Sequence, residues 1–341
     1  MTILIFGAFI FIHELGHYLF ARLFDVAIKE FAIGFGPKIA SVVSKKTGIR
    51  YSLRAFPIGG FVSMVGEEGD EEGEENPRAL CRKRPWKRLI IDAAGGAMNL
   101  ILGFILMTVY VLGLGESYFG SNRIAQFRDN SPSEKCGLMI DDEIYSINGS
   151  RTFTANDVVY EVYRNGTEGA KVKVVRDGEK ITLEDVVFPT ASDSGITYGK
   201  CDFSVYRVEK DFGTVVKFSL SQSRLGVKMV WESLIDLIRG RYGMESVSGP
   251  IGAGEAIGEA AREGGVELAY LCALITINLG LFNLLPFPAL DGCHVLFDLI
   301  EMIFRRRPGK RFETALNLFG LFILLSLTVV IGFKDVFMLF K

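Results

Sequence analysis

Four apolar runs, each long enough to cross a bilayer as a helix, dominate the sequence. A bilayer core about 30 Å thick is crossed by roughly 20 helical residues, and such runs lie at residues 2–24, 89–114, 267–288 and 313–333. The first run has no basic segment before it and no small-residue cleavage site after it, so we expect a retained helix and not a signal peptide. A mean hydropathy of +0.28 is too high for a water-soluble protein of this size. The sequence therefore predicts a polytopic α-helical membrane protein with four transmembrane helices.

Basic residues beside these runs predict which side of the membrane each end faces. Lys and Arg near the ends of membrane spans favour the cytoplasmic side. They gather between the first two runs and again between the last two. We therefore expect both termini and the section 115–266 to be extracytoplasmic, and loops 25–88 and 289–312 to be cytoplasmic.

The loop after the first run has the pattern of a small β-sheet. Residues 29–65 alternate β-branched, aromatic and small side chains on both sides of the turn signal KKTG at 45–48. Glycines within this segment suggest backbone that re-enters the membrane, which is tolerated only where protein covers it or where it lines a wet cavity. The acidic run EEGDEEGEEN at 67–76 is typical of a solvated connector, and we expect no catalytic role for it.

The extracytoplasmic section combines short strands, turn dipeptides and a helix-like stretch near 154–164. Its pattern SPxEKxGLxxxDxIxxING resembles a PDZ domain of bacterial membrane proteases, in which backbone amides beside an apolar groove capture an extended peptide by strand addition. Asp141 stands where that pattern usually has glycine. We expect one PDZ domain at 115–190 and a connector with amphipathic helices at 191–266.

Five cysteines are spread along the chain without the CxxC spacing of a zinc ribbon and without the pattern of a disulfide framework. We expect unpaired, small hydrophobic side chains. Cys136 and Cys201 could form a disulfide if their section faces an oxidising space.

HELGH at residues 13–17 places three ionisable groups inside the first apolar run. Such groups cost on the order of 2.5–3.5 kcal/mol each at membrane depth, so they are usually paired, metal-bound or functional. Because residues four apart share one helix face, His13 and His17 can present two imidazole nitrogens to one zinc ion. Glu14 is then placed to take a proton from water at the metal. The alternative is that carbonyls satisfy both histidines and that Glu14 lines a proton path.

A catalytic zinc site needs a third protein ligand, and Asp291 at the cytoplasmic end of the third run is our preferred candidate. Pro286 and Pro288 interrupt the helix just before it and free the backbone to bend inward. His294, three residues further on, could share the same helix face and is the rival ligand. Cys293 should point away from Asp291.

The ordered combination of motifs resembles the site-2 protease family of intramembrane zinc metalloproteases, in its bacterial RseP-like form with a single PDZ domain. The resemblance covers nearly the whole chain. It comprises HELGH in the first run, GGAMNLILGFIL (95–106) in the second, NLLPFPALDG (283–292) in the third, and a PDZ-like insertion between the second and third. Cys293 and His294 stand where the family usually has glycine and arginine.

This resemblance implies a multi-pass protein of the bacterial plasma (inner) membrane that cleaves within membrane spans. It implies that His13, His17 and Asp291 hold Zn²⁺ and that Glu14 is catalytic. The substrate would be a single-pass membrane protein already shortened outside by another protease, such as an anti-sigma factor or a remnant signal peptide. The PDZ domain would screen substrates by bulk, and peptide binding by that domain is the competing idea.

Substrate binding requires that a membrane helix unwind, because all of its amides are bonded internally. An exposed strand edge at Gly60, Phe61 and Val62 could replace those bonds by pairing with the extended substrate. By resemblance, Asn283 matches a substrate-contacting asparagine and Asn99 a polar position on the second span, and we expect both to bind substrate. The alternatives are an edge that is paired internally and an asparagine that is satisfied by its own helix.

Two other classes of function compete with proteolysis. One is a catalytically inactive membrane scaffold that presents a PDZ domain, and the other is a zinc or ion transporter. A transporter predicts several polar rows along the spans, whereas the sequence has one cluster at one depth. Nothing in the sequence points to a nucleic-acid partner.

Overall fold

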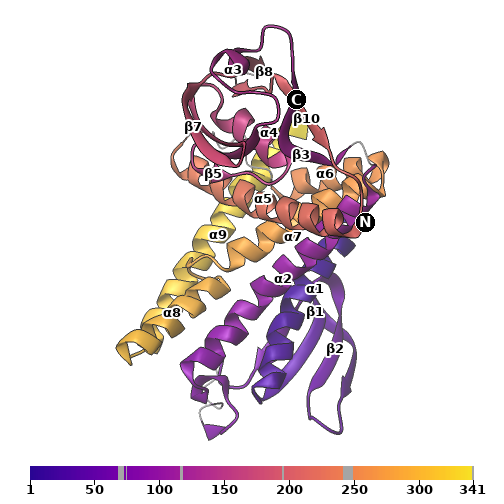
Figure 1. The fold of residues 1–341 in the computed structure, drawn as a ribbon. Helices are drawn as coiled ribbons and strands as arrows, with labels where there is room; N and C mark the ends of the chain where they lie inside the picture. Colours follow the sequence, from indigo (N-terminus) through magenta and orange to yellow (C-terminus); the bar gives the residue numbers. More distant parts are fainter. Residues whose placement is uncertain (68–72, 74, 116–117, 194–195, 241–248, 340–341) are drawn as a thin grey trace. The chain divides into compact units, whose positions relative to one another are not determined.

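The computed structural model describes residues 1–341 except 68–72, 74, 116–117, 194–195, 241–248 and 340–341 (Figure 1). Most of the acidic run at 67–76 thus lies outside the described residues. The chain divides into two compact units, of which the first comprises residues 1–106 and 227–341 and the second residues 107–226.

Four helices in the described part of the chain are long and apolar enough to cross a bilayer. These helices agree with the four runs expected from the sequence, with ends that differ by a few residues. Many apolar side chains of the last one are exposed, as expected of a helix that faces lipid. The four helices are α1 (Thr2–Leu23), α2 (Pro85–Gly113), α7 (Gly265–Asn283) and α9 (Lys310–Leu339).

Glycines bring three of these helices into close contact. A Cβ added to Gly16 of α1 would lie 2.4 Å from the carbonyl oxygen of Ala94 in α2. Gly96 of α2 and Gly280 of α7 face each other, and a Cβ on either would come within 2.9 Å of the other's carbonyl oxygen. Small residues allow such close approach in membranes, where van der Waals packing drives helix association. The HELGH face of α1 therefore lies directly against α2.

A small antiparallel sheet packs beside α1. It is made of two long strands, β1 (Ile28–Val43) and β2 (Arg50–Met64), which bend at glycines with φ of +85°. Phe31 pairs with both Tyr51 and Val62, so the first half of β1 lies between the two halves of β2. The second half of β2 consequently forms an outer edge of the sheet. Figure 1 shows this sheet alongside α1.

A buried cluster of ion pairs joins α2 to α8 (Asp291–Phe304) and α9. Arg88 Nε donates to Asp298 Oδ1 over 2.9 Å, and its guanidinium also pairs with Glu301. Arg307 lies 3.4 Å from the same Asp298 carboxylate and 2.8 Å from Glu313. The Asp298 side chain is fully buried. These contacts anchor α8, the helix that begins with Asp291.

Arg88→Ala should strongly destabilise the first unit, because it leaves the buried Asp298 carboxylate with only its longer contact to Arg307. Breaking one partner of a buried pair costs about 3–5 kcal/mol. Thermal unfolding in detergent measures this loss as a lower midpoint. The double variant Arg88→Met/Asp298→Leu removes both charges and should recover most of the stability. A single variant that unfolds at the wild-type temperature would contradict the assigned role of the pair.

The second unit is built on a six-stranded antiparallel sheet in the order β10-β3-β4-β6-β7, with the short β5 paired to β4. Its interior consists of aliphatic and aromatic side chains from the strands and from α4. The helix expected near 154–164 is α4 (Ala155–Asn165). The other elements are β3 (Gly120–Phe127), α3 (Pro132–Lys135), β4 (Glu143–Ile147), β5 (Ser150–Arg151), β6 (Ala170–Arg176), β7 (Glu179–Val186), a separate hairpin of β8 (Thr190–Asp193) and β9 (Ile196–Gly199), and β10 (Phe203–Arg207).

The sheet of this unit extends beyond residue 190, the end expected for the PDZ domain. β10 pairs with β3, and Phe203 belongs to the hydrophobic core of the sheet. The short strands in this part of the sequence show no clear alternation of apolar and polar residues, so the sequence there resembles a connector. An amphipathic helix, as expected within the section 191–266, follows as α5 (Phe212–Ile238), and α6 (Pro250–Glu263) precedes α7 in the chain.

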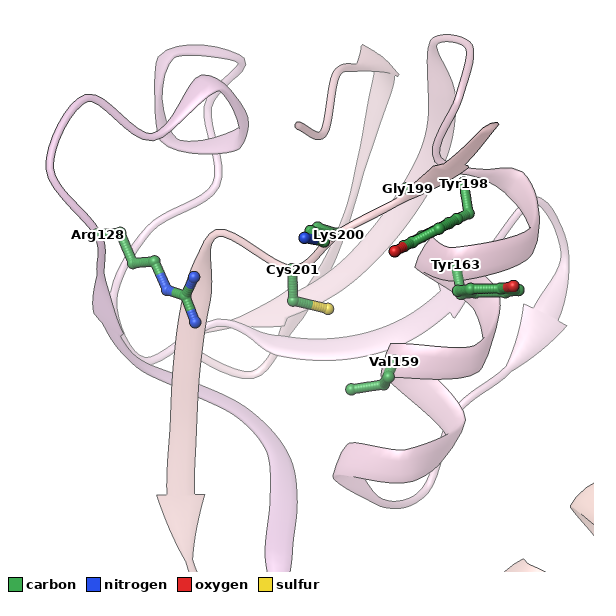
Figure 2. A pocket seen from close by; sticks show the side chains of 7 residues that line it. All are labelled: Arg128, Val159, Tyr163, Tyr198, Gly199, Lys200 and Cys201. Atoms are coloured by element: carbon green, nitrogen blue, oxygen red, sulfur yellow. The ribbon is translucent and has the colours of Figure 1, made fainter. Parts of the chain in front are cut away.

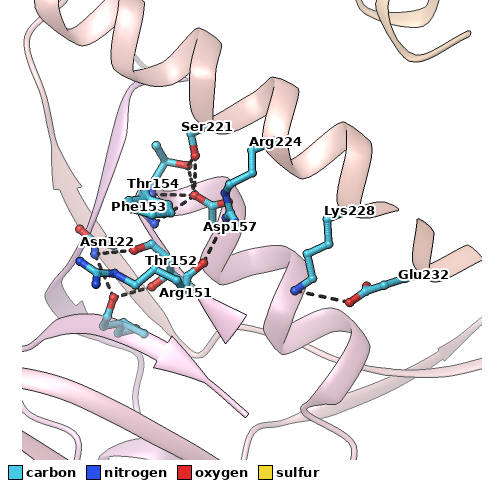
Figure 3. A network of polar contacts seen from close by, with 11 residues as sticks. Asn122, Arg151, Thr152, Phe153, Thr154, Asp157, Ser221, Arg224, Lys228 and Glu232 are labelled. Atoms are coloured by element: carbon cyan, nitrogen blue, oxygen red, sulfur yellow. Dashed lines mark hydrogen bonds and ion pairs between the residues drawn. The ribbon is translucent and has the colours of Figure 1, made fainter. Parts of the chain in front are cut away.

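A polar network fastens α5 to the start of α4 (Figure 3). The Asp157 carboxylate accepts the Ser221 hydroxyl over 2.6 Å and the Arg224 guanidinium over 2.6 Å. It also accepts the backbone N–H of Thr154 and so caps α4. The Asp157 side chain is almost fully buried, and its charge is matched by the arginine.

Candidate metal centre

Two imidazoles project from one face of α1 onto α2, as the four-residue spacing predicts. Both His13 and His17 are buried, and their Nε2 atoms lie 3.2 Å apart. Nδ1 of His17 lies 2.8 Å from the carbonyl oxygen of Ile91, which can only accept a hydrogen bond. The proton of His17 is therefore on Nδ1, and Nε2 presents a lone pair.

Asp291 reaches the same point from the turn between α7 and α8. α7 ends at Asn283, the two prolines of NLLPFPALDG follow, and Asp291 is the first residue of α8. Gly292 permits the turn to close, because a Cβ there would lie 2.1 Å from the carbonyl oxygen of Leu285. α9 supports the turn from outside through Asn317, whose side chain accepts the Ala289 N–H over 3.1 Å.

The three side chains converge with the geometry of a metal site. Oδ2 of Asp291 lies 3.0 Å from Nε2 of His13 and 3.3 Å from Nε2 of His17. Ligand atoms about 2.0–2.1 Å from a tetrahedral zinc ion are separated by roughly 3.3 Å. Oδ2 is also buried without a hydrogen bond. A cation among these atoms would relieve the repulsion of their lone pairs, so the residues fit a zinc ion.

Asn99 is fully buried and lies behind His13. Its amide nitrogen is 3.4 Å from Nδ1 of His13, while its carbonyl Oδ1 is buried without a hydrogen-bond partner. Rotating the amide by 180° exchanges the two atoms and gives an Nδ1–H of His13 an acceptor, which would leave Nε2 free to bind a metal. Asn99 therefore contacts a candidate ligand, and its expected contact with substrate stays a prediction.

Glu14 lies on α1 next to the histidines without joining their cluster. Its Oε2 accepts the backbone N–H of Val62 over 3.0 Å, from the outer edge of β2. This bond holds the half-buried carboxylate in one orientation beside the three converging atoms. The edge strand expected at Gly60–Val62 thus contacts the site directly.

The remaining candidates are placed as follows. Asn283 is half-buried at the last residue of α7, and Phe61 stacks on Phe35 in the sheet. His294 packs against Phe297 and is not part of the metal-type cluster found among the described residues. The buried Cys293 is likewise outside this cluster.

Gly95 is the contact that the sequence did not single out. A Cβ added there would lie 2.3 Å from Nε2 of His17 and 2.7 Å from Nε2 of His13. The position therefore admits only glycine if both imidazoles keep their places. The only sequence signal for this contact was the pair Gly95–Gly96 within an apolar run. Gly96 contacts α7, and Gly95 contacts the two histidines.

A hollow lies in the second unit, between α4 and the edge strand β10 (Figure 2). Val159 and Tyr163 of α4 line it together with Cys201, and the ring of Tyr163 stacks on that of Tyr198. Burial, assisted by the charge of Asp202, raises the pKa of the Cys201 thiol to about 12. The thiol is therefore protonated at neutral pH. Cys136 and Cys201 are not joined by a disulfide, so the pairing of these two residues is not formed in this structure.

The comparisons with known proteins agree with this geometry. The family model of peptidase family M50 matches residues 1–327. The chain is 29% identical to the regulator of sigma-W protease RasP of Bacillus subtilis, over 99% of this chain and 98% of the relative. It is 29% identical, with the same coverage, to the zinc metalloprotease RasP of Bacillus licheniformis. It is also 36% identical to a Clostridium acetobutylicum protein provisionally named a zinc metalloprotease, over 98% and 96% of the two chains.

These matches extend over both units and include HELGH, the sheet beside it and the turn that carries Asp291. They confirm the resemblance to the site-2 proteases that the motifs indicated. The chain belongs to peptidase family M50.

Proposed function

We propose that this zinc metalloendopeptidase cleaves peptide bonds within the membrane-spanning segments of single-pass proteins. The observation that carries the proposal is the convergence of His13, His17 and Asp291 on one point between apolar helices. Ionisable groups at that depth are expensive unless a metal or a partner compensates them. A bound Zn²⁺ would supply the compensating charge, and the two Nε2 atoms and Oδ2 of Asp291 would hold it.

Each residue of the centre has a distinct task. Zinc, when bound, supplies Lewis-acid chemistry that polarises the scissile carbonyl and acidifies water. Glu14, fixed by the Val62 N–H, accepts the proton from the attacking water and returns it to the leaving nitrogen. Ile91 and Asn99 act as positioning residues, because each contacts the outer Nδ1 of one imidazole.

The outer edge of β2 is the place where we propose that substrate binds. A substrate helix must unwind to expose its scissile bond, and its freed backbone groups need new partners. The edge at Gly60–Val62 offers such partners beside Glu14, and pairing there would bring an extended chain next to the metal. Asn283, at the end of α7, is proposed to hold one further backbone group.

The second unit is proposed to be an extracytoplasmic PDZ domain. Its edge strand β10, the neighbouring helix α4 and the hollow between them support this assignment. The basic loops orient the centre toward the cytoplasmic half of the bacterial inner membrane. On this arrangement the domain screens substrates, so that only proteins shortened by an earlier extracytoplasmic cut, such as anti-sigma factors or remnant signal peptides, reach the zinc.

Comparing membrane proteomes of cells with the wild-type protein and with Glu14→Gln tests the proposed substrate class. We expect at least one clipped single-pass protein to accumulate in the variant, because its second cut is missing. Restoring the wild-type protein should remove that fragment. Unchanged amounts of all single-pass fragments, with the variant protein present at normal levels, would contradict the proposal.

A further inference from the structure

Two carboxylates accept hydrogen bonds from neighbouring outward-facing amides on the outer edge of β2. Val62 N–H donates to Glu14 Oε2, and Met64 N–H donates to Glu67 Oε2, both over 3.0 Å. Residues two apart in a strand point their backbone groups to the same side. On the opposite side the strand pairs with β1, through Val62 with Phe31 and Met64 with Ile28. The two carboxylates therefore occupy the hydrogen-bonding positions that an added strand would use.

The two carboxylates differ in how firmly they are held. Glu14 belongs to the long helix α1, which packs against α2. Glu67 lies beyond the end of β2, and its side chain is exposed. Its bond to the Met64 N–H nevertheless places its carboxylate on the same edge as that of Glu14. Of the two carboxylates bound to this edge, the one of Glu67 is thus the one that can move away.

We propose that Glu67 guards the substrate-binding edge: its carboxylate holds the Met64 amide in the free enzyme and leaves when a carbonyl of the extended substrate takes that position. The inference rests on the proposed protease function and adds a residue that governs substrate entry. An unfilled edge at this place would pair with any extended segment, and an edge of this kind is a recognised aggregation risk. A displaceable internal acceptor protects the edge and makes entry depend on a strand that can replace the carboxylate with its own carbonyl.

This role predicts a change in KM with little change in kcat. Hydrogen bonds to a charged group are roughly twice as strong as neutral ones, so removing the carboxylate lowers the cost of substrate entry. Glu67→Ala should lower KM by about threefold to tenfold. Glu67→Asp keeps the charge but is one methylene shorter, and it should resemble alanine if the bond to Met64 matters. Glu75→Gln, which removes an exposed charge from the same loop, should leave KM unchanged.

The probe is a synthetic single-span peptide in detergent micelles, with a central Gly-Pro pair to weaken its helix and a fluorophore and quencher on either side. Cleavage by the zinc-loaded full chain gives KM and kcat. Binding of the same peptide to the Glu14→Gln variant, with and without Glu67→Ala, gives affinity without cleavage. Deuterium exchange reports on the Met64 amide directly.

The expected result is a lower KM in Glu67→Ala and Glu67→Asp, with faster exchange at Met64 that slows again when the peptide binds. Equal KM and equal peptide affinity in all forms would overturn the role of Glu67, as would a wild-type KM in Glu67→Asp. Loss of folding stability with unchanged KM would assign Glu67 to the turn alone. Absence of cleavage by the wild-type protein would count against the protease function and not against the role of Glu67. Peptide binding and deuterium exchange still test that role, because neither measurement requires cleavage.

Discussion

Glu14→Gln is expected to lower kcat by about 10²–10⁴-fold while the purified protein keeps its metal. General-base catalysis by a positioned side chain contributes a factor of this size. Glu14 has the position such a base requires, since it lies next to the histidines and is fixed by the Val62 N–H over 3.0 Å. It is not among the three residues whose atoms converge. Glutamine has almost the same shape, so the helix and the metal-binding atoms should be undisturbed.

Zinc content and peptide cleavage, measured on the same preparations, check this expectation. His17→Ala is the matched comparison, because it should lose zinc and activity together. A Glu14→Gln protein that retains activity would remove the general base from the account. A wild-type protein that moves zinc across vesicles without proteolysis would favour a transporter, and one with neither metal nor activity would favour a scaffold.

Gly95→Ala is expected to abolish activity by removing the metal. The added Cβ would lie 2.3 Å from Nε2 of His17 and 2.6 Å from Cε1 of His13, far inside van der Waals contact. Neither imidazole has room to retreat, because Ile91 and Asn99 contact their outer nitrogens. Disturbing groups that merely support metal ligands costs 10–100-fold in affinity. Displacing the ligands themselves should lower zinc affinity by more than about 100-fold.

Gly103→Ala provides the control on the same helix. A Cβ there would meet the Ile277 side chain at 2.5 Å and none of the metal-site residues. It should lower the thermal midpoint without lowering the zinc content. If instead Gly95→Ala kept one zinc per chain with wild-type affinity, the close packing of α2 against the histidines would be refuted.

The sequence predicted the parts of the centre that depend on local spacing. Histidines four apart must share a helix face, and two prolines followed by an aspartate must interrupt a helix, so His13, His17 and Asp291 could be named in advance. Their convergence depends on packing between helices far apart in the chain. Glycine contacts such as Gly96 with Gly280 set that packing, and they leave no periodic signal.

The sequence was less informative where polar residues have more than one use. Asn99 suggested a substrate contact, and the approach of α2 to α1 adds a contact with His13 that the sequence did not predict. Glu67 begins an acidic run that is typical of a solvated connector, yet the end of β2 brings its carboxylate onto the Met64 amide. In both cases a tertiary contact, absent from any local pattern, determines what the side chain does.

Metal analysis of the purified full-length protein, wild type beside Asp291→Ala, tests the central claim most directly. The account predicts one zinc ion per wild-type chain. It predicts far less in Asp291→Ala, because two imidazoles on one helix are left without the third ligand that the α7–α8 turn supplies. A wild-type protein without stoichiometric zinc, or an Asp291→Ala protein that binds it as tightly as wild type, would contradict the account.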